Sequence, residues 1–152
     1  VPAAAAMTDL LVKEVDYLSI GTNDLIQYYL AVDRSNEFVS YLYKPLHPSI
    51  LRLIRSIIET AQKAGKEISV CGEMAADPLA AIALLGFGMV NFSMNPIFIP
   101  KIKKTLRSVE FKNVKKVVRE AMTLKTAQEI EEHIIEKILV KHPNAFLTGK
   151  VI

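Results

Sequence analysis

The chain is poor in the residues that several protein classes require. It has one cysteine, Cys71, so no intrachain disulfide can form, which fits a reducing compartment. It has no apolar run of the length of a membrane span. The formal net charge is only +3, and we interpret the basic residues of segment 101–107 as a solvated helix face. These scarcities argue against a disulfide-stabilised, membrane-spanning or nucleic-acid-binding protein.

Recognisable catalytic motifs are also missing. The chain has no zinc-ligand spacing, no Gly-rich phosphate loop of the usual form and no well-placed nucleophile–histidine–acid set. His47 precedes Pro48, where we expect it to cap or pack the start of a helix, and His133 and His142 receive no role. The opening VPAAAA has no positive leader and no initiator methionine, so we expect the middle of a longer chain and not a signal peptide.

The composition that remains is that of a globular domain with a real core, at 51% hydrophobic and 23% charged over 152 residues. Residues 1–140 are expected to form this domain, and the tail 141–152 to be loosely ordered. Hydrophobic periodicity and capping residues define the expected elements. The first part of the chain is expected to form a helix at 3–14 with Met7, Leu10 and Leu11 on one face, a strand at 16–21, an ambiguous segment at 25–33 and a long connection at 34–47. A helix from Pro48 to a stop at Gly65, a strand at 67–71, a helix capped by Asp77 and a strand at 90–94 follow. The remaining helices are expected from Pro100, at 113–123 and from Thr126.

Alternating strands and helices predict an α/β fold with a parallel sheet and right-handed crossovers. A closed eight-stranded barrel needs about 250 residues. The chain is therefore either a small open sheet or a portion, about three βα units, of a barrel whose earlier strands precede Val1. Such a piece is expected to expose strand edges and an apolar face, and so to be marginally stable, aggregating or oligomeric.

Polar residues follow the end of each predicted strand, at 21–24, 71–73 and 93–95. Because the carboxyl ends of parallel strands share one edge of a sheet, these segments are expected to lie side by side and form a ligand site. A plain turn is the alternative for residues 21–24, since Gly, Asn and Asp are common turn formers.

Three side chains at this edge have suitable chemistry. Asp24 could bind Mg²⁺, which takes one or two protein carboxylates and completes its shell with water and substrate. Cys71 could act as an acid, base or nucleophile, or be a small buried hydrophobe. Arg34 could clamp a phosphate, or be a surface arginine paired with Asp33 or Glu37.

Two further features of this region remain open. Glu73 is either a second carboxylate of the edge or a cap for the next loop. The connection 34–47 carries Phe38, Tyr41 and Tyr43, and a connection this long is often functional. Its aromatics could cover a ligand or face a partner, although we expect Phe38 simply to pack the loop down.

Four segments carry a resemblance to a known family. They are YLSIGTNDLIQYYLAVDRSNE at 17–37, YLYKPLHPSILRLI at 41–54, VCGEMAADPLA at 70–80 and NFSMNP at 91–96. The first resembles the signature of the phosphoenolpyruvate-utilising enzymes, and the set resembles the Enzyme I family of the bacterial sugar phosphotransferase system, the phosphoenolpyruvate–protein phosphotransferases. Pyruvate phosphate dikinase and phosphoenolpyruvate synthase share the Asn-Asp and Cys-Gly-Glu elements but match the other stretches less well.

The resemblance implies a cytoplasmic, homodimeric enzyme with a (β/α)₈ TIM-type barrel that binds phosphoenolpyruvate and Mg²⁺ at its carboxyl edge. It implies that Asp24 is a metal ligand that also meets the substrate, that Asn23 contacts the substrate and that Arg34 binds its phosphate. Cys71 is implied as the proton donor that converts the enolate to pyruvate. The phosphoryl group is expected to pass to a histidine on another domain and on to a phosphocarrier histidine protein for sugar uptake.

Parts of the family's site are absent. The second metal ligand of the family is a Glu directly before the Val-Pro-Ala segment, where this chain begins with Val1. The arginines of the earlier strands and the domain with the acceptor histidine are also missing. We therefore expect a fragment that does not turn over alone. The alternatives are a non-catalytic module for dimerisation or partner contact through 34–47, or a dikinase or synthase relative.

Overall fold

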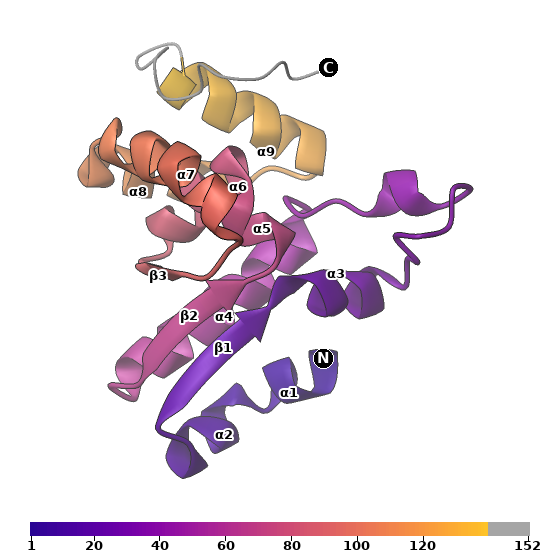
Figure 1. The fold of residues 1–152 in the computed structure, drawn as a ribbon, viewed down its shortest axis with the longest axis vertical. Helices are drawn as coiled ribbons and strands as arrows, with labels where there is room; N and C mark the ends of the chain where they lie inside the picture. Colours follow the sequence, from indigo (N-terminus) through magenta and orange to yellow (C-terminus); the bar gives the residue numbers. More distant parts are fainter. Residues whose placement is uncertain (140–152) are drawn as a thin grey trace.

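The computed structural model describes residues 1–139, and Figure 1 shows their arrangement. The helices and strands are α1 (Pro2–Ala6), α2 (Thr8–Glu14), β1 (Tyr17–Gly21), α3 (Thr22–Leu30), α4 (Pro48–Lys63), β2 (Glu67–Cys71), α5 (Glu73–Ala76), α6 (Pro78–Gly86), β3 (Asn91–Phe92), α7 (Ile99–Arg107), α8 (Phe111–Ala121) and α9 (Ala127–Ile134). Short helical turns occur at Ser40–Leu42, Pro96–Phe98 and Ile135–Leu139. The expected loose tail at 141–152 lies outside the described residues.

The described strands form one parallel sheet in the order β1-β2-β3. The β1–β2 register places Gly21 opposite Cys71, and the β2–β3 register places Val70 opposite Phe92. Helices α4 and α6 lie in the two connections between these strands, as crossovers between parallel strands require. The predicted α/β class with a parallel sheet is confirmed, in a chain that is mostly helical.

The two faces of the sheet differ in polarity because successive side chains of a strand point to opposite sides. One face carries Leu18, Ile20, Ile68, Val70 and Phe92, which belong to or pack against the core. The other carries Tyr17, Ser19, Ser69, Cys71 and Asn91. In Figure 1, α4 lies behind β1 and β2 and their other face is turned to the viewer. The face of the sheet without a helix thus carries hydroxyls and a thiol, whereas the large exposed apolar side chains lie mostly outside the sheet.

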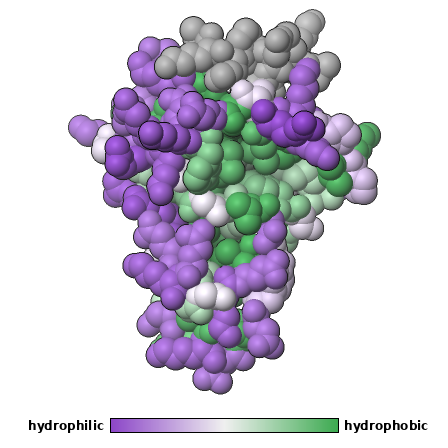
Figure 2. Space-filling view, turned by 90° about the vertical axis from the view of Figure 1, so that its left-hand side faces the viewer, coloured by the Kyte–Doolittle hydropathy of each residue, from purple (hydrophilic) through white to green (hydrophobic). Residues whose placement is uncertain are grey.

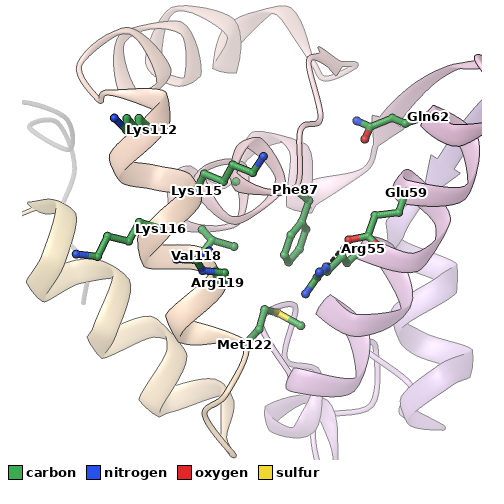
Figure 3. A pocket seen from close by; sticks show the side chains of 11 residues that line it. Arg55, Glu59, Gln62, Phe87, Lys112, Lys115, Lys116, Val118, Arg119 and Met122 are labelled. Carbon is green, nitrogen blue, oxygen red and sulfur yellow. Dashed lines mark hydrogen bonds and ion pairs between the residues drawn. The ribbon is translucent and has the colours of Figure 1, made fainter.

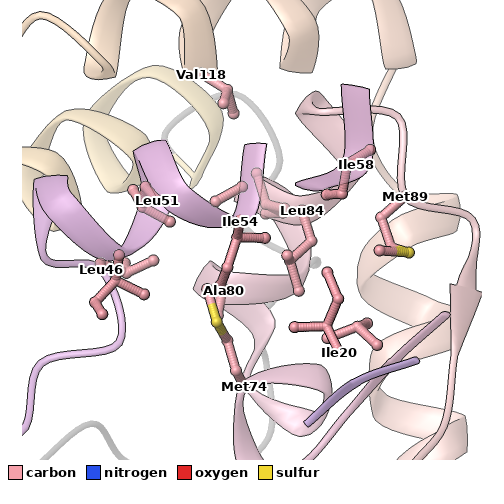
Figure 4. Close-up of a cluster of buried hydrophobic side chains, with 14 of the residues drawn as sticks. Ile20, Leu46, Leu51, Ile54, Ile58, Met74, Ala80, Leu84, Met89 and Val118 are labelled. Carbon is pink, nitrogen blue, oxygen red and sulfur yellow. The ribbon is translucent and has the colours of Figure 1, made fainter. Parts of the chain in front are cut away.

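The core sits between the sheet and helices α4, α6 and α8 (Figure 4). Ile54 and Ile58 of α4 and Leu84 of α6 are fully buried, and Ile20 of β1 and Val118 of α8 belong to the same cluster. The periodic apolar residues predicted for α4 account for its buried side. Burial of each such side chain stabilises the fold by about 1.5–3 kcal/mol relative to exposure.

Capping residues fix the helix ends as the sequence indicated. The Asp77 carboxylate accepts the Ala80 N–H at 2.8 Å, and the His47 ring accepts the Ser49 N–H at 3.3 Å. Thr126 and Glu129 form a reciprocal capping box at the start of α9. Gly65 follows the end of α4 with a φ of 66°, in the left-handed region that favours glycine.

The N-terminal helix differs from its prediction. The expected continuous helix at 3–14 is divided into α1 and α2 at Met7, whose φ of −104° and ψ of 17° are not helical. Met7 and Leu10 are exposed, whereas Thr8 and Val12 are buried. The Thr8 hydroxyl donates to the Ala5 carbonyl at 2.7 Å, so a buried hydroxyl is satisfied within the chain. The buried side of this segment is therefore not the face of Met7, Leu10 and Leu11 that the periodicity predicted.

Three other predictions are corrected by tertiary context. β3 is only Asn91–Phe92 and not 90–94, and Val90 is 74% exposed. Of the ambiguous segment 25–33, residues 25–30 are helical and belong to α3, which begins earlier, at Thr22, and ends at Leu30. Phe38 is 87% exposed and does not pack its loop down. In each case the deciding factor is which neighbouring elements cover the segment, and a local pattern does not contain that information.

None of the helices in the described part of the chain combines the length and apolarity needed to cross a membrane.

Candidate functional site at the carboxyl edge of the sheet

The ends of β1 and β2 meet as the strand argument predicted. Because Gly21 lies opposite Cys71, the residues that follow each strand are direct neighbours. The Thr22 hydroxyl donates to the Cys71 carbonyl at 2.8 Å. The Glu73 backbone N–H donates to the Asn23 side-chain oxygen at 3.0 Å. Residues about 50 positions apart in sequence are thus joined by side-chain to backbone hydrogen bonds, which fix the edge of the sheet.

Gly72 is required for this close approach. Its φ of 100° lies in a region that side-chain-bearing residues rarely adopt. A Cβ at this position would lie 2.5 Å from the Thr22 hydroxyl oxygen and 2.8 Å from the Asn23 side-chain oxygen. The absence of a side chain therefore lets the backbone after β2 contact the first turn of α3.

Asp24 lies in the first turn of α3 and not in an irregular turn. Its side chain is exposed and makes no hydrogen bond or ion pair with the residues that the structure describes. A carboxylate is favoured at this position because the N-terminal end of a helix carries partial positive charge. The free carboxylate oxygens suit a hard cation that needs one or two protein ligands and completes its shell with water.

Arg34 and Glu73 form an ion pair with 2.5 Å between Nη1 and Oε1. Asp33 and Glu37 were the partners considered from the sequence, and the described ion pair of Arg34 is with neither of them. Asp33 instead accepts the Ser35 N–H at 2.8 Å. The two side chains are 39% and 69% exposed, so the pair contributes little to stability. The ion pair ties the start of the long connection to the edge of the sheet and places a guanidinium there.

Tyr43 belongs to the same group, although the sequence interpretation assigned it no definite role. Burial raises the pKa of its phenol, the negative charges of Glu73 and Asp24 raise this pKa further, and Arg34 opposes them. These effects show that the phenol lies within electrostatic reach of all three charged side chains. Tyr43 therefore stays protonated near neutral pH and can donate a hydrogen bond at the edge.

Cys71 is half-buried at the end of β2 and meets a hydroxyl on the open face of the sheet. The Ser19 hydroxyl donates to the Cys71 sulfur at 3.8 Å, and Ser69 donates to Ser19 at 3.1 Å. The Tyr17 hydroxyl in turn donates to Ser69. The sequence interpretation missed these three hydroxyls. The parallel register is the signal that could have found them, since it puts Ser19 beside Ser69 on the same face as Cys71.

The third predicted segment contributes less to this group. The Ser93 N–H donates to the Val70 carbonyl at 2.8 Å, which continues the β2–β3 pairing toward the same edge. Asn95 caps the following helical turn by accepting the Ile97 N–H at 3.1 Å. Within residues 1–139 there is no group of three or more His, Cys, Asp or Glu arranged to hold a metal ion.

These features define an α/β protein with a polar site at the carboxyl edge of a parallel sheet, where a carboxylate, a guanidinium, an amide and a thiol come together. Residues 1–111 match the family described as PEP-utilising enzyme, PEP-binding domain. The chain belongs to this family.

Curated relatives identify a narrower group of similar proteins. The chain is 48% identical over 141 residues to the phosphoenolpyruvate-protein phosphotransferase of Haemophilus influenzae, an alignment that covers 93% of the chain and 24% of that protein. It is 50% identical over 129 residues to the protein of the same name from Buchnera aphidicola, covering 85% and 23%. For the Listeria monocytogenes protein the identity is 47% over 137 residues, covering 90% and 24%. The chain thus spans about a quarter of the length of the curated relatives it matches.

Proposed function

We propose that this chain supplies part of the phosphoenolpyruvate site of a phosphoenolpyruvate–protein phosphotransferase. The observation that carries the proposal is the grouping of Asn23, Asp24, Arg34 and Cys71 around the joined ends of β1 and β2. The similarity to proteins of that name supports the same reaction. A pyruvate phosphate dikinase or phosphoenolpyruvate synthase relative is a weaker alternative, because the most similar curated relatives reported above are all phosphotransferases.

In the proposed complex, Arg34 binds the phosphate of phosphoenolpyruvate. Its Nη1 is paired with Glu73, and the remaining guanidinium N–H groups are available for a charge-assisted, bidentate contact. Asn23 uses its side-chain oxygen to accept the Glu73 N–H, which leaves its amide NH₂ to donate to the substrate. The hydrogen bond to Glu73 orients the Asn23 amide for this contact.

Asp24 is the metal ligand in this proposal. Its exposed, unpaired carboxylate in the first turn of α3 fits a Mg²⁺ ion that is shared with substrate oxygens and water. A bound Mg²⁺ would neutralise negative charge on the phosphate and the enolate. The negative charge of Asp24 also helps to raise the pKa of the Tyr43 phenol, after burial and the charge of Glu73.

Cys71 completes the chemistry as the proton donor. When the phosphoryl group leaves for its acceptor, the bond between phosphorus and the enol oxygen breaks and the enolate of pyruvate remains. The electron pair at the methylene carbon then takes the proton of the Cys71 thiol, which forms a C–H bond and leaves a thiolate. The hydroxyl of Ser19, 3.8 Å from the sulfur, is placed to donate a hydrogen bond to that thiolate.

The sheet is proposed to be part of a (β/α)₈ barrel. Its apolar face is covered by helices, as expected of the outer face of such a barrel, and its opposite face carries hydroxyls and the thiol. Both edge strands, β1 and β3, have a free side in the described sheet. In Figure 2, which shows the left-hand side of Figure 1, apolar surface forms a band between hydrophilic flanks. Further barrel elements would cover such surface.

In the whole protein the phosphoryl group would pass to a histidine on another domain, then to a phosphocarrier histidine protein that serves sugar uptake in the cytoplasm. None of the histidines in this chain stands in a motif that resembles the acceptor site. The chain alone is therefore proposed to bind the substrate without transferring the phosphoryl group. Phosphoryl transfer to a carrier protein by this chain alone would overturn that view.

Direct binding tests the proposal. Calorimetric titration of the folded chain with phosphoenolpyruvate and Mg²⁺ should show weak binding that Asp24→Ala abolishes. The matched control is Asp9→Ala, which removes an exposed first-turn carboxylate of α2, away from the edge. Binding that survives in Asp24→Ala, or that is lost equally in Asp9→Ala, would contradict the assigned metal ligand.

A second role in assembly has its own supporting observation. On the 34–47 connection, Phe38 is 87% exposed and Tyr41 is 68% exposed, and aromatic side chains are enriched at protein interfaces. We propose that this loop contacts a second copy of the chain in the homodimer. Absence of phosphoenolpyruvate binding together with concentration-dependent association would favour a purely non-catalytic assembly role.

A further inference from the structure

A cleft lies on the helical side of the molecule, away from the carboxyl edge of the sheet. It has a volume of about 480 Å³ and is walled by α4, by the end of α6 and by α8. Figure 3 shows the Phe87 ring in the middle of the cleft, with Lys115 on the side of α8 and Arg55 on the side of α4. Neither the family match nor the proposed reaction assigns a role to these residues. The volume lies within the range of small-molecule sites, about 300–1,000 Å³.

The floor of the cleft is apolar because α6 and α8 are in close contact. A Cβ at Gly86 would lie 2.5 Å from Cγ2 of Val118, so only glycine allows this approach. Phe87 follows directly and is half-buried, and Met122 also lines the cleft. The result is an apolar surface that is held in place by the packing of two helices.

The rim of the cleft is strongly basic. The described lining residues include five cations, Arg55, Lys112, Lys115, Lys116 and Arg119, and one carboxylate, Glu59. Glu59 is paired with Arg55 at 2.6 Å. Within the described residues, the four cations of α8 have no ion-pair partner. The rim therefore carries positive charge that the chain itself does not neutralise.

The spacing of these cations is unfavourable for the helix alone. The pairs Lys112–Lys115, Lys112–Lys116, Lys115–Arg119 and Lys116–Arg119 are three or four residues apart, so the four cations lie on one face of α8. Like charges at such spacing repel one another and destabilise a helix. An anion bound in the cleft would remove this repulsion, and it would do so next to an aromatic ring.

We propose that this cleft binds a phosphorylated small molecule with a flat ring, the chemistry of a nucleoside phosphate. The phosphates would lie between Lys115, Arg119 and Arg55, where a guanidinium can bind phosphate through two N–H groups. The ring would stack on Phe87, a contact that tolerates any base because every base has a flat face. This site is separate from the phosphoenolpyruvate edge, so both ligands can be bound at once.

The test is a calorimetric titration of the full protein that carries this chain with ADP in EDTA, alongside pyrophosphate and adenosine. The proposal expects saturable binding of ADP that Lys115→Glu and Arg119→Glu each weaken at least tenfold. The charge-matched control, Lys13→Glu at the end of α2, is expected to leave it unchanged. Phe87→Leu keeps an apolar side chain and removes the ring, so it should bring the affinity for ADP down to that for pyrophosphate.

The same titration is repeated with saturating phosphoenolpyruvate and Mg²⁺ to separate the two sites. The proposal expects ADP binding to persist, whether or not phosphoenolpyruvate binds at the edge. Loss of the ADP signal here, but not at the same Mg²⁺ concentration without phosphoenolpyruvate, would show that ADP occupies the edge instead. An equal affinity for ADP and pyrophosphate in the unaltered protein, or no effect of Lys115→Glu in a variant with native circular dichroism, would also overturn the proposal.

Discussion

The lack of a side chain at Gly72 is essential to the geometry of the candidate site. Gly72 combines a φ of 100° with contacts that leave no room for a Cβ beside Thr22 and Asn23. Gly72→Ala should therefore lower the free energy of unfolding by about 1–3 kcal/mol and weaken phosphoenolpyruvate binding, because the side chain would displace Asn23. Urea unfolding and calorimetric titration measure the two effects.

Gly65→Ala is the matched control for this prediction. Gly65 also has a left-handed φ, 66°, but a Cβ there meets nothing within 4 Å. Its substitution should cost about 1–2 kcal/mol of stability from the backbone alone and leave ligand affinity unchanged. Equal loss of ligand affinity in both variants would show that Gly72 acts through general stability and not through Asn23.

The role of Arg34 depends on geometry as well as charge. Arg34→Lys keeps the positive charge but replaces the planar fork by a single ammonium group. We expect phosphoenolpyruvate affinity to fall about tenfold or more, as expected for loss of a charge-assisted hydrogen bond worth about 1.5–3 kcal/mol. The free energy of unfolding should change by less than about 1 kcal/mol, because the ion pair with Glu73 is exposed. A variant that is destabilised but binds normally would make Arg34 a structural residue.

At the scale of elements, the capping box fixes the start of α9. The Thr126 hydroxyl accepts the Glu129 N–H at 3.1 Å, and the helix then buries Ile130 and Ile134. Thr126→Ala should lower the free energy of unfolding by about 1 kcal/mol, whereas Thr126→Ser keeps the hydroxyl and should be close to neutral. Equilibrium unfolding of the two variants checks this, and equal losses would assign the effect to the Thr methyl group.

The other half of the box gives a dependence on pH. Hydrogen bonds from the backbone N–H groups of Lys125 and Thr126 lower the pKa of Glu129 from its usual 4.5. A lowered pKa in the folded state means that this stabilisation is present above pH 4.5 and is lost as the pH falls through the folded-state value.

Glu129→Gln tests this dependence, because it keeps a capping acceptor and removes the charge. The melting temperature of the unaltered chain should exceed that of the variant at pH 7, and the difference should close toward pH 3. A difference that stays constant over this range would contradict the assignment to the Glu129 carboxylate.

At the scale of the molecule, the sheet has two free edges and an exposed aromatic loop. Unpaired edge strands invite association, as do exposed aromatic side chains. The chain alone should therefore associate with increasing concentration in sedimentation experiments. Replacing Phe38 and Tyr41 by serine should reduce the association if the loop mediates it. A monomer with a cooperative calorimetric transition would contradict the expectation.

Much of this protein follows from its sequence because the signals are local. Apolar periodicity located α4, side-chain caps located the starts of α6 and α9, and the strand at 67–71 was found with its exact bounds. The order of elements also predicted the parallel sheet. That sheet in turn predicted the meeting of Asn23 and Asp24 with the segment after β2, since parallel strands end at one edge.

Only the tertiary structure decided the features that depend on which elements touch. The pairing of Arg34 with Glu73, the approach of Tyr43, the line of hydroxyls that leads to Cys71 and the basic cleft beside Phe87 all join segments far apart in the chain. No local pattern encodes those distances. The break at Met7, the short β3 and the exposed Phe38 have the same origin, because burial depends on the neighbours that the fold brings.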